Sequence, residues 1–347
     1  MCQDCFPPTR RGHVGGPDVA PSVHGFDAGL SGRLLDDGVG LAPPRLVLEG
    51  LVQASQRSQD PEMAAEIVRS FLQRQISNAA AEGANVVVND IRKEAADAVV
   101  AEIAAAGGKA IANADDITRI ETAQQIVDAA VAAFGEVHVV VNNAGILRDK
   151  TFHKMEDADW DLVYRVHVEG AYKVTRAAWP HMREQNYGRV IFTASTSGIY
   201  GNFGQSNYGM AKLGLYGLTR TLALEGRKNN VLVNAIAPTG GTRMTEGLIP
   251  PQVFEQLKPE LVSPLVVYLA SEQCQETSGL FEVGGGWMGK VRWERSLGVG
   301  FDPQSGFDAE DVAAQWQQIC NFENAAHPAD NMEALKEMMA NLQKYAG

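Results

Sequence analysis

The chain has 347 residues, of which 45% are hydrophobic, so it can bury a sizeable core in one large domain or two small ones. Acidic residues outnumber basic ones by 42 to 30, and the net charge of −12 argues against a surface for nucleic acid or an anionic membrane. No apolar run approaches the roughly 18 residues of a membrane-spanning helix, and the N-terminus lacks a signal-peptide core.

The cysteines point to a reducing compartment. Cys2 and Cys5 form the single Cys-x-x-Cys pair, and Cys274 and Cys320 stand apart. Because no second pair completes a zinc site, we expect no metal and an intracellular, soluble protein. The chain ends at Gly347 without a Ser-Lys-Leu-type peroxisome address.

The first 59 residues do not read as a folded domain. They contain nine Gly and six Pro, about a quarter of the segment, which is near the composition where order is lost. Residues 45–48 form its one strand-like piece. A helix is expected over residues 60–82, because Asp60 suits the N-cap, Pro61 suits the first helical position, and Gly83 ends the pattern.

After Gly83, buried strand-like runs alternate with helical segments. We expect strands at 85–90, 109–114, 137–141, 188–194, 231–238 and 279–286, and helices at 93–106, 118–134, 159–185, from the Tyr208 region to about 225, and at 264–270. This alternation gives βαβ units, a parallel sheet and right-handed crossovers that place helices on both faces. The predicted fold class is α/β, a doubly wound parallel sheet with three Rossmann-like αβα layers.

The domain organisation follows from these patterns. Residues 1–59 read as a disordered or aberrant segment, and residues 60–290 as the Rossmann-like domain. Residues 291–347 read as a helical extension, with helices expected at 309–320 and 332–345.

The residues from Ser195 to Lys212 carry the strongest chemical signal. Tyr208 and Lys212 are four residues apart, so on a helix they lie on one face, one turn from each other. A phenol with a pKa near ~10 is a poor acid or base at neutral pH, and a neighbouring lysine should lower that pKa. A serine on the preceding segment would hold a carbonyl oxygen while Tyr208 moves the proton, which is acid/base chemistry at a carbonyl or alcohol.

Residues 83–289 resemble the short-chain dehydrogenase/reductase family. The resemblance is carried by the Tyr-x-x-x-Lys pair, the strand and serine cluster ahead of it, and the run Asn142-Asn143-Ala144-Gly145 after a buried strand. Three further stretches, 145–149, 198–205 and 286–295, look like the (3R)-hydroxyacyl-CoA dehydrogenase unit of peroxisomal multifunctional β-oxidation enzymes.

The resemblance implies a set of site residues. The family spacing selects Ser195 over Ser197 as the serine that acts with Tyr208 and Lys212. His167 stands where the family usually has an asparagine that holds a water in a proton relay, and either a similar role or a packing role is open for it. The implied cofactor contacts are Asp90 at the adenosine ribose, Asp115 and Asp116 near the adenine, Asn143, Ala144 and Gly145 at a ribose, Tyr208 and Lys212, and Pro238, Gly240 and Thr242 at the nicotinamide end.

The implied reaction is oxidation of a (3R)-3-hydroxyacyl-CoA by NAD, in a homodimer and by resemblance in the peroxisome, with the cytoplasm as the alternative. Residues 243–262 would form a variable substrate lid. Asp90 favours NAD because an acid there bonds the ribose and repels a 2′-phosphate, although Arg92 nearby would weaken that preference. Two alternatives remain: a 3-oxoacyl-carrier-protein reductase using NADPH, and a catalytically dead, dimerising binding protein.

One departure from the family pattern affects both fold and chemistry. The opening strand and its Thr-Gly-x-x-x-Gly-x-Gly turn should precede the helix that ends at Gly83, yet residues 60–77 contain no glycine. That turn brings backbone amides onto the pyrophosphate. Either a substitute strand such as 46–48 fills the central slot, or the sheet has a gap, or residues 1 to about 75 come from a different reading frame or exon.

Overall fold

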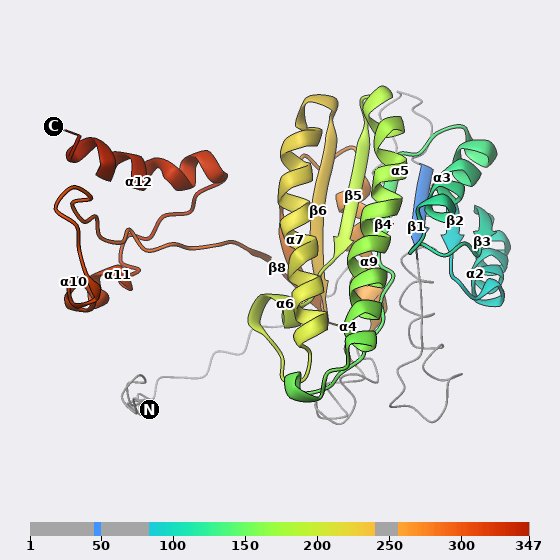
Figure 1. Cartoon of the computed structure of the whole chain (residues 1–347). Helices are drawn as coiled ribbons and strands as arrows, with labels where there is room; N and C mark the ends of the chain where they lie inside the picture. The colour runs from blue at the N-terminus through green and yellow to red at the C-terminus, as the bar shows by residue number, and fades with distance from the viewer. Residues whose placement is uncertain (1–44, 50–82, 240–255, 347) are drawn as a thin grey trace, which may run out of the picture. The chain divides into compact units, whose positions relative to one another are not determined.

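The computed structural model describes residues 45–49, 83–239 and 256–346. These residues build a sheet with the strand order β3-β2-β1-β4-β5-β6-β7-β8 (Figure 1). Pairing is parallel from β3 through β7, and β8 runs antiparallel at the edge. The predicted doubly wound parallel sheet is confirmed. The strands are β1 (Arg45–Glu49), β2 (Asn85–Asn89), β3 (Lys109–Asn113), β4 (Val139–Asn142), β5 (Gly188–Thr193), β6 (Val231–Pro238), β7 (Leu280–Gly284) and β8 (Trp287–Val291).

Helices cover both faces of this sheet. The α-helices are α2 (Lys93–Ala105), α3 (Ile120–Phe134), α4 (Asp157–Tyr164), α5 (Ala171–Glu184), α6 (Thr196–Tyr200), α7 (Ser206–Gly226), α9 (Ser263–Ala270), α10 (Ala309–Ala314), α11 (Trp316–Ile319) and α12 (Asn331–Lys344), and a π-helix, η3 (Arg165–Gly170), joins α4 to α5. Short 3₁₀ turns lie at Phe152–Lys154, Arg227–Asn229 and Pro259–Leu261.

Two apolar layers hold the helices to the sheet. Successive strand residues point to opposite faces, so Val87 and Val140 join the core under α3, α5 and α7, while Val86 and Val141 join the core under α2 and α9. Figure 1 shows α3, α5 and α7 along one face of the strands. The buried strands read as continuous apolar runs because both of their faces are covered.

Strand β1 fills the central slot. Its residues Leu46 and Leu48 pair in parallel with β2 on one side and with β4 on the other. Of the three alternatives, the substitute strand at 46–48 is present and a gap in the sheet is excluded, while a different reading frame or exon for residues 1 to about 75 is untested and stays a prediction. The predicted helix at 60–82 lies outside the described residues.

Several expected elements differ in detail. The single helix expected at 159–185 is divided into α4, η3 and α5, and the tail helix expected at 309–320 is two short helices. Strand β8 was not expected, and it forms because the chain reverses at Gly285 and Gly286, both of which have positive φ. No helix of the described residues is long and apolar enough to cross a bilayer. The domain boundaries at 59 and 290 stay predictions.

The carboxyl ends of the parallel strands meet at one edge of the sheet. Glu49 is in register with Asn89 on β2 and with Asn142 on β4, and Asn142 is in register with Phe192 on β5. Ligands of such sheets bind beyond this edge. The edge therefore positions the loops that carry the candidate site.

Candidate functional site

Ser195 lies just beyond the carboxyl end of β5 and caps the first turn of α6. Its Oγ accepts a hydrogen bond from the backbone N–H of Ser197 at 3.2 Å. It also lies near the Tyr208 side chain, and its interaction with the phenol on its own lowers the pKa of that group. The structure therefore places Ser195 against the tyrosine.

Two glycines let α6 lie directly against α7, which carries Tyr208. A Cβ on Gly198 would lie 2.8 Å from the backbone nitrogen of Leu213, and a Cβ on Gly209 would lie 3.0 Å from the backbone oxygen of Ser197. Side chains at these positions would force the helices apart and separate Ser195 from the phenol. The sequence analysis missed this requirement, although both glycines lie within the motif itself.

Lys212 lies one turn after Tyr208; the lysine is buried and the tyrosine is partly buried. Its Nζ is 5.5 Å from the centroid of the Tyr208 ring and donates to the backbone oxygen of Thr193 at 2.6 Å. Lys212 is only 3% exposed. The lysine nitrogen is thus held beside the partly buried tyrosine ring.

Burial dominates the acid–base properties of this pair. It lowers the pKa of Lys212 to about 7 and raises the pKa of Tyr208 to about 12, with Asp149 adding to the rise and Ser195 opposing it. The expectation that Lys212 lowers the tyrosine pKa is therefore wrong for this structure. The physical reason is that a lysine with a pKa of about 7 is only about half charged at neutral pH, so it adds little field at the phenol.

His167 lies in the π-helical turn and contacts the loop after β4. Its Nε2 is 3.0 Å from the backbone nitrogen and 2.8 Å from the backbone oxygen of Ile146. Its Nδ1 is buried and has no hydrogen-bond partner among the described residues. The ring stands edge-on to Tyr208, with centroids 5.2 Å apart. π-Turns are frequent at functional sites, and this one brings His167 to the tyrosine.

Burial, with the nearby Lys212 charge, holds the pKa of His167 well below its ordinary value, so the imidazole is neutral. Gly145 makes room for it, because a Cβ there would lie 2.5 Å from the ring's Cε1. The sequence analysis assigned Gly145 to close approach of a ribose. Its nearest neighbour in the structure is the imidazole.

Asp90 and Arg92 form a pair at the end of β2. The Asp90 carboxylate accepts a hydrogen bond from the Arg92 backbone N–H at 2.8 Å, and the guanidinium lies 3.4 Å from its other oxygen. Asp90 is buried, whereas the Arg92 side chain is about one-third exposed. The expected influence of Arg92 on this acid is thus present as a direct ion pair.

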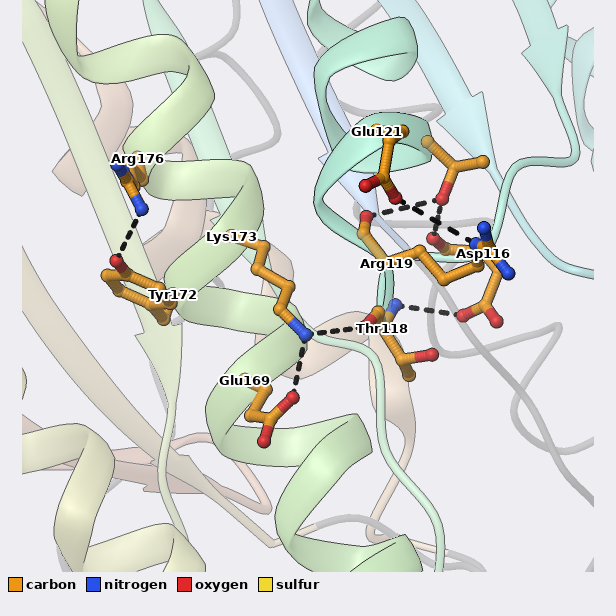
Figure 2. A network of polar contacts seen from close by, with 9 residues as sticks. Asp116, Thr118, Arg119, Glu121, Glu169, Tyr172, Lys173 and Arg176 are labelled. Carbon is orange, nitrogen blue, oxygen red and sulfur yellow. Dashed lines mark hydrogen bonds and ion pairs between the residues drawn. The ribbon is translucent and has the colours of Figure 1, made fainter.

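Asp115 and Asp116 both make bonds that shape the loop after β3. Asp115 accepts from the side chain of Asn113 at 2.7 Å. The Asp116 carboxylate accepts from the Thr118 backbone N–H at 2.8 Å, and Lys173 on α5 donates to the Thr118 carbonyl while pairing with Glu169 (Figure 2). These contacts fix the loop that was expected near the adenine.

The remaining predicted contacts divide between described and masked residues. Asn143 accepts a hydrogen bond from Thr193, Ala144 is buried, and Pro238 ends β6 at the same sheet edge. Gly240 and Thr242 lie outside the described residues. The structure therefore brings together Ser195, Tyr208, Lys212, His167 and the loop 143–146.

These residues fit part of a dinucleotide. Partly buried Tyr208, buried Lys212, the loop after β4 with Gly145 and the acid after β2 offer the polar groups that a nicotinamide ribose and an adenosine ribose require. The pyrophosphate part is different, because after Gly50 the next glycine in the sequence is Gly83. The glycine-rich turn that would hold that part is absent from the sequence.

The chain is similar to several known proteins. The family model "short chain dehydrogenase" matches residues 74–250. The "Peroxisomal multifunctional enzyme type 2" of Mus musculus is 51% identical over 272 residues, which cover 76% of this chain and 37% of that protein. A "3-oxoacyl-[acyl-carrier-protein] reductase" of Thermotoga maritima is 37% identical over 58% of this chain and 85% of its own length.

The structure of full-length peroxisomal multifunctional enzyme type 2 from Drosophila melanogaster superposes with a TM-score of 0.72 at 36% identity, covering 88% of this chain and 50% of that one. The chain thus spans half or less of the lengths of these two multifunctional enzymes.

We predict that the stability of the protein rises with pH relative to Lys212→Met. The Lys212 pKa is about 7 in the folded chain against 10.5 for a model lysine, so between these values the unfolded chain binds a proton that the folded chain does not. Folding is therefore favoured as pH rises through that window, by about 1 kcal/mol per pH unit. Urea unfolding of both proteins at several pH values between 7 and 9.5 measures the difference. A difference that does not change with pH would show that Lys212 titrates normally.

Proposed function

Because the chain belongs to the short-chain dehydrogenase family, a family of oxidoreductases that use a nicotinamide cofactor, we propose that it interconverts a (3R)-3-hydroxyacyl-CoA and the 3-oxoacyl-CoA, with NAD as the cofactor. One observation carries the chemistry: Ser195 lies beside Tyr208, with Lys212 buried one turn away at the carboxyl edge of a parallel sheet. The acyl-CoA substrate rests on the resemblance to multifunctional enzymes, and fatty-acid β-oxidation and a peroxisomal location rest on the same resemblance.

In this mechanism the chain's own residues orient the substrate and move one proton. Ser195 holds the substrate oxygen, and Tyr208 gives a proton to it during reduction or takes one during oxidation. The nicotinamide cofactor supplies the hydride donor or acceptor when bound. Lys212 bonds the nicotinamide ribose, and its ammonium form favours the phenolate at the moment of proton transfer.

The pKa values of Tyr208 and Lys212 affect reduction and oxidation differently. With a pKa of about 12, the phenol stays protonated at neutral pH, which suits the acid role in reduction. Oxidation needs a stronger positive field at the phenol, because the base is the phenolate. Charging Lys212, whose pKa is about 7, supplies such a field. The oxidation rate therefore depends on whether this lysine is charged.

His167 is proposed to accept a hydrogen bond at Nδ1 from a water in the proton relay to Lys212. This is the part that the family's asparagine plays. The unpartnered, buried Nδ1 and the neutral ring support this role. The contacts of Nε2 with Ile146 hold the ring in place. The packing role remains the alternative.

Two other functions are weighed against this one. A 3-oxoacyl-carrier-protein reductase using NADPH is less favoured. The reductase of Thermotoga maritima is 37% identical over 58% of this chain, whereas the mouse enzyme is 51% identical over 76% of it. A catalytically dead, dimerising binding protein is favoured by one feature, the absent glycine-rich turn. The assembled Ser195, Tyr208 and Lys212 count against that reading.

A homodimer is proposed on the resemblance. Its support in the chain is the C-terminal extension, which exposes large apolar side chains along its length: Trp293, Leu297, Phe307, Trp316, Phe322, Met332, Met338, Met339 and Leu342. In the described structure the extension contacts α7 through Arg220, which donates to the Ala329 carbonyl, and through the rings of Tyr216 and Trp293.

The direct test is to titrate the purified chain with NADH by fluorescence and to assay it with a 3-hydroxyacyl-CoA. We predict that Tyr208→Phe loses at least about 100-fold in kcat with little change in Tm, because only the reacting hydroxyl is removed. Tyr216→Phe, a buried tyrosine on the same helix, is the matched control and should keep activity. Unchanged turnover in Tyr208→Phe would remove the acid/base assignment. Failure of the folded wild type to bind NADH would instead favour the binding protein.

The two nitrogens of His167 are separated by two substitutions. Asn places an amide near the Nδ1 position and Gln places one near Nε2. We predict that His167→Asn retains about tenfold more kcat than His167→Gln, because only the former keeps an acceptor at the Nδ1 position. The readout is kcat of each variant with saturating substrate, with Tm as the control for packing. Equal losses in both variants would favour the packing role.

We predict that Asp90→Ala lowers the ratio of kcat/KM for NAD over NADP by about tenfold or more. The substitution removes the acid that repels a 2′-phosphate and frees Arg92 from its ion pair. Asp97→Ala is the matched control, since Asp97 is an exposed acid on α2 paired with Lys93. A wild type that already prefers NADP would contradict the ribose argument.

A further inference from the structure

Thr193, the last residue of β5, extends past the end of its neighbour β4. Strand β4 ends at Asn142, which is in register with Phe192, so Thr193 has no ladder partner on that side. The next N–H, that of Ala194, donates to Ile236 on β6 at 2.7 Å. Because the peptide is planar and trans, the Thr193 carbonyl points the opposite way, toward the β4 side. Pairing of the sheet therefore leaves this buried carbonyl without a backbone partner.

Lys212 occupies that position. Its Nζ donates to the Thr193 carbonyl at 2.6 Å, and both residues are buried. A buried, unpaired carbonyl is costly, so the shortened β4 creates an acceptor that the lysine satisfies. The Thr193 carbonyl thus fixes the lysine nitrogen beside Tyr208.

The hydroxyl of the same threonine holds a second partner. Its Oγ1 donates to the side-chain Oδ1 of Asn143 at 2.8 Å. With Oδ1 engaged, the Nδ2 group of Asn143 is the end of the amide that can donate elsewhere. Asn143 is half-buried, and it opens the loop that continues to Gly145 and Ile146, against which His167 packs.

We propose that Thr193 is a positioning residue: its carbonyl sets the position of Lys212, and its hydroxyl sets the Asn143 amide in the loop proposed to contact the cofactor. The carbonyl and the hydroxyl of one residue thereby hold Lys212 and Asn143 in fixed positions relative to each other. This deepens the proposed function and rests on it. The ligand class concerned is the ribose–nicotinamide end of a dinucleotide.

The test compares three variants of the full chain. Thr193→Val removes the hydroxyl and keeps the β-branched shape and the carbonyl, while Thr193→Ser restores the hydroxyl. Thr219→Val is the matched control, because Thr219 is a fully buried threonine on α7 whose hydroxyl bonds only the Leu215 carbonyl of its own helix. Each is measured for Tm, for KM of the dinucleotide and for the pH profile of kcat/KM, to which Lys212, Tyr208 and neighbouring His167 contribute.

Thr193→Val is expected to raise KM for the dinucleotide about five- to tenfold, as loss of one buried hydrogen bond implies, while the retained carbonyl keeps the pH profile close to that of the wild type. Thr193→Ser should stay within about twofold of wild type. Thr219→Val should lose Tm comparably while keeping KM and the pH profile. If Thr193→Val behaves like Thr219→Val, or if Ser fails to rescue it, the positioning role is overturned.

A second readout separates this proposal from the proposed function. If the wild type neither binds nor turns over a dinucleotide, the proposed function fails, and amide hydrogen exchange in the free protein still tests Thr193. Exchange at residues 143–146 should be about fivefold or more faster in Thr193→Val and unchanged in Thr219→Val. Equal exchange in all three proteins would show that the hydroxyl does not hold the loop.

Discussion

The bond from Lys212 to the Thr193 carbonyl is the contact on which the site depends. It exists because β5 extends one residue beyond β4, and it holds the amine of Lys212 in a buried position. Burying that group lowers its pKa to about 7, so the lysine changes charge near neutral pH. Tyr208, desolvated beside it, is held protonated. A charged ligand bound beside the pair would therefore shift the pKa values of both Lys212 and Tyr208.

Packing around His167 gives the site its second support. Gly145 lacks the side chain that would strike the imidazole, the π-turn aims the ring at Tyr208, and Ile146 binds Nε2 through its backbone. None of these features stabilises the fold by much on its own. Together they hold a neutral imidazole against the tyrosine, and they leave Nδ1 as a buried acceptor. An acceptor left unpaired in a core is costly, which is the physical argument for a solvent or ligand partner there.

Much of the fold follows from local pattern, whereas the site's details depend on tertiary contacts. Apolar runs such as Val86–Val88 predict buried parallel strands. Gly135 predicts a helix end, and its φ in the structure is 90°. The spacing of Ser195, Tyr208 and Lys212 along the sequence is enough to predict that they lie together after β5 and on α7. The π-turn at His167 leaves no sequence signal, because it depends on packing against the loop after β4. Likewise, the pKa values of Tyr208 and Lys212 follow from burial, which spacing alone does not reveal.

The proposed proton-transfer residues and the segment that would bind the cofactor's phosphates lie in different parts of the fold. Strand β1 completes the sheet, so β2 and β4 pair on both sides. Its sequence nonetheless continues without the glycines that bring backbone amides to a pyrophosphate. The groups proposed to move the proton lie at the start of α6 and on α7, and they are held by Thr193, Gly198 and Gly209 rather than by the segment after β1. A missing phosphate cradle therefore weakens cofactor affinity first, and it leaves the geometry of Ser195, Tyr208 and Lys212 intact.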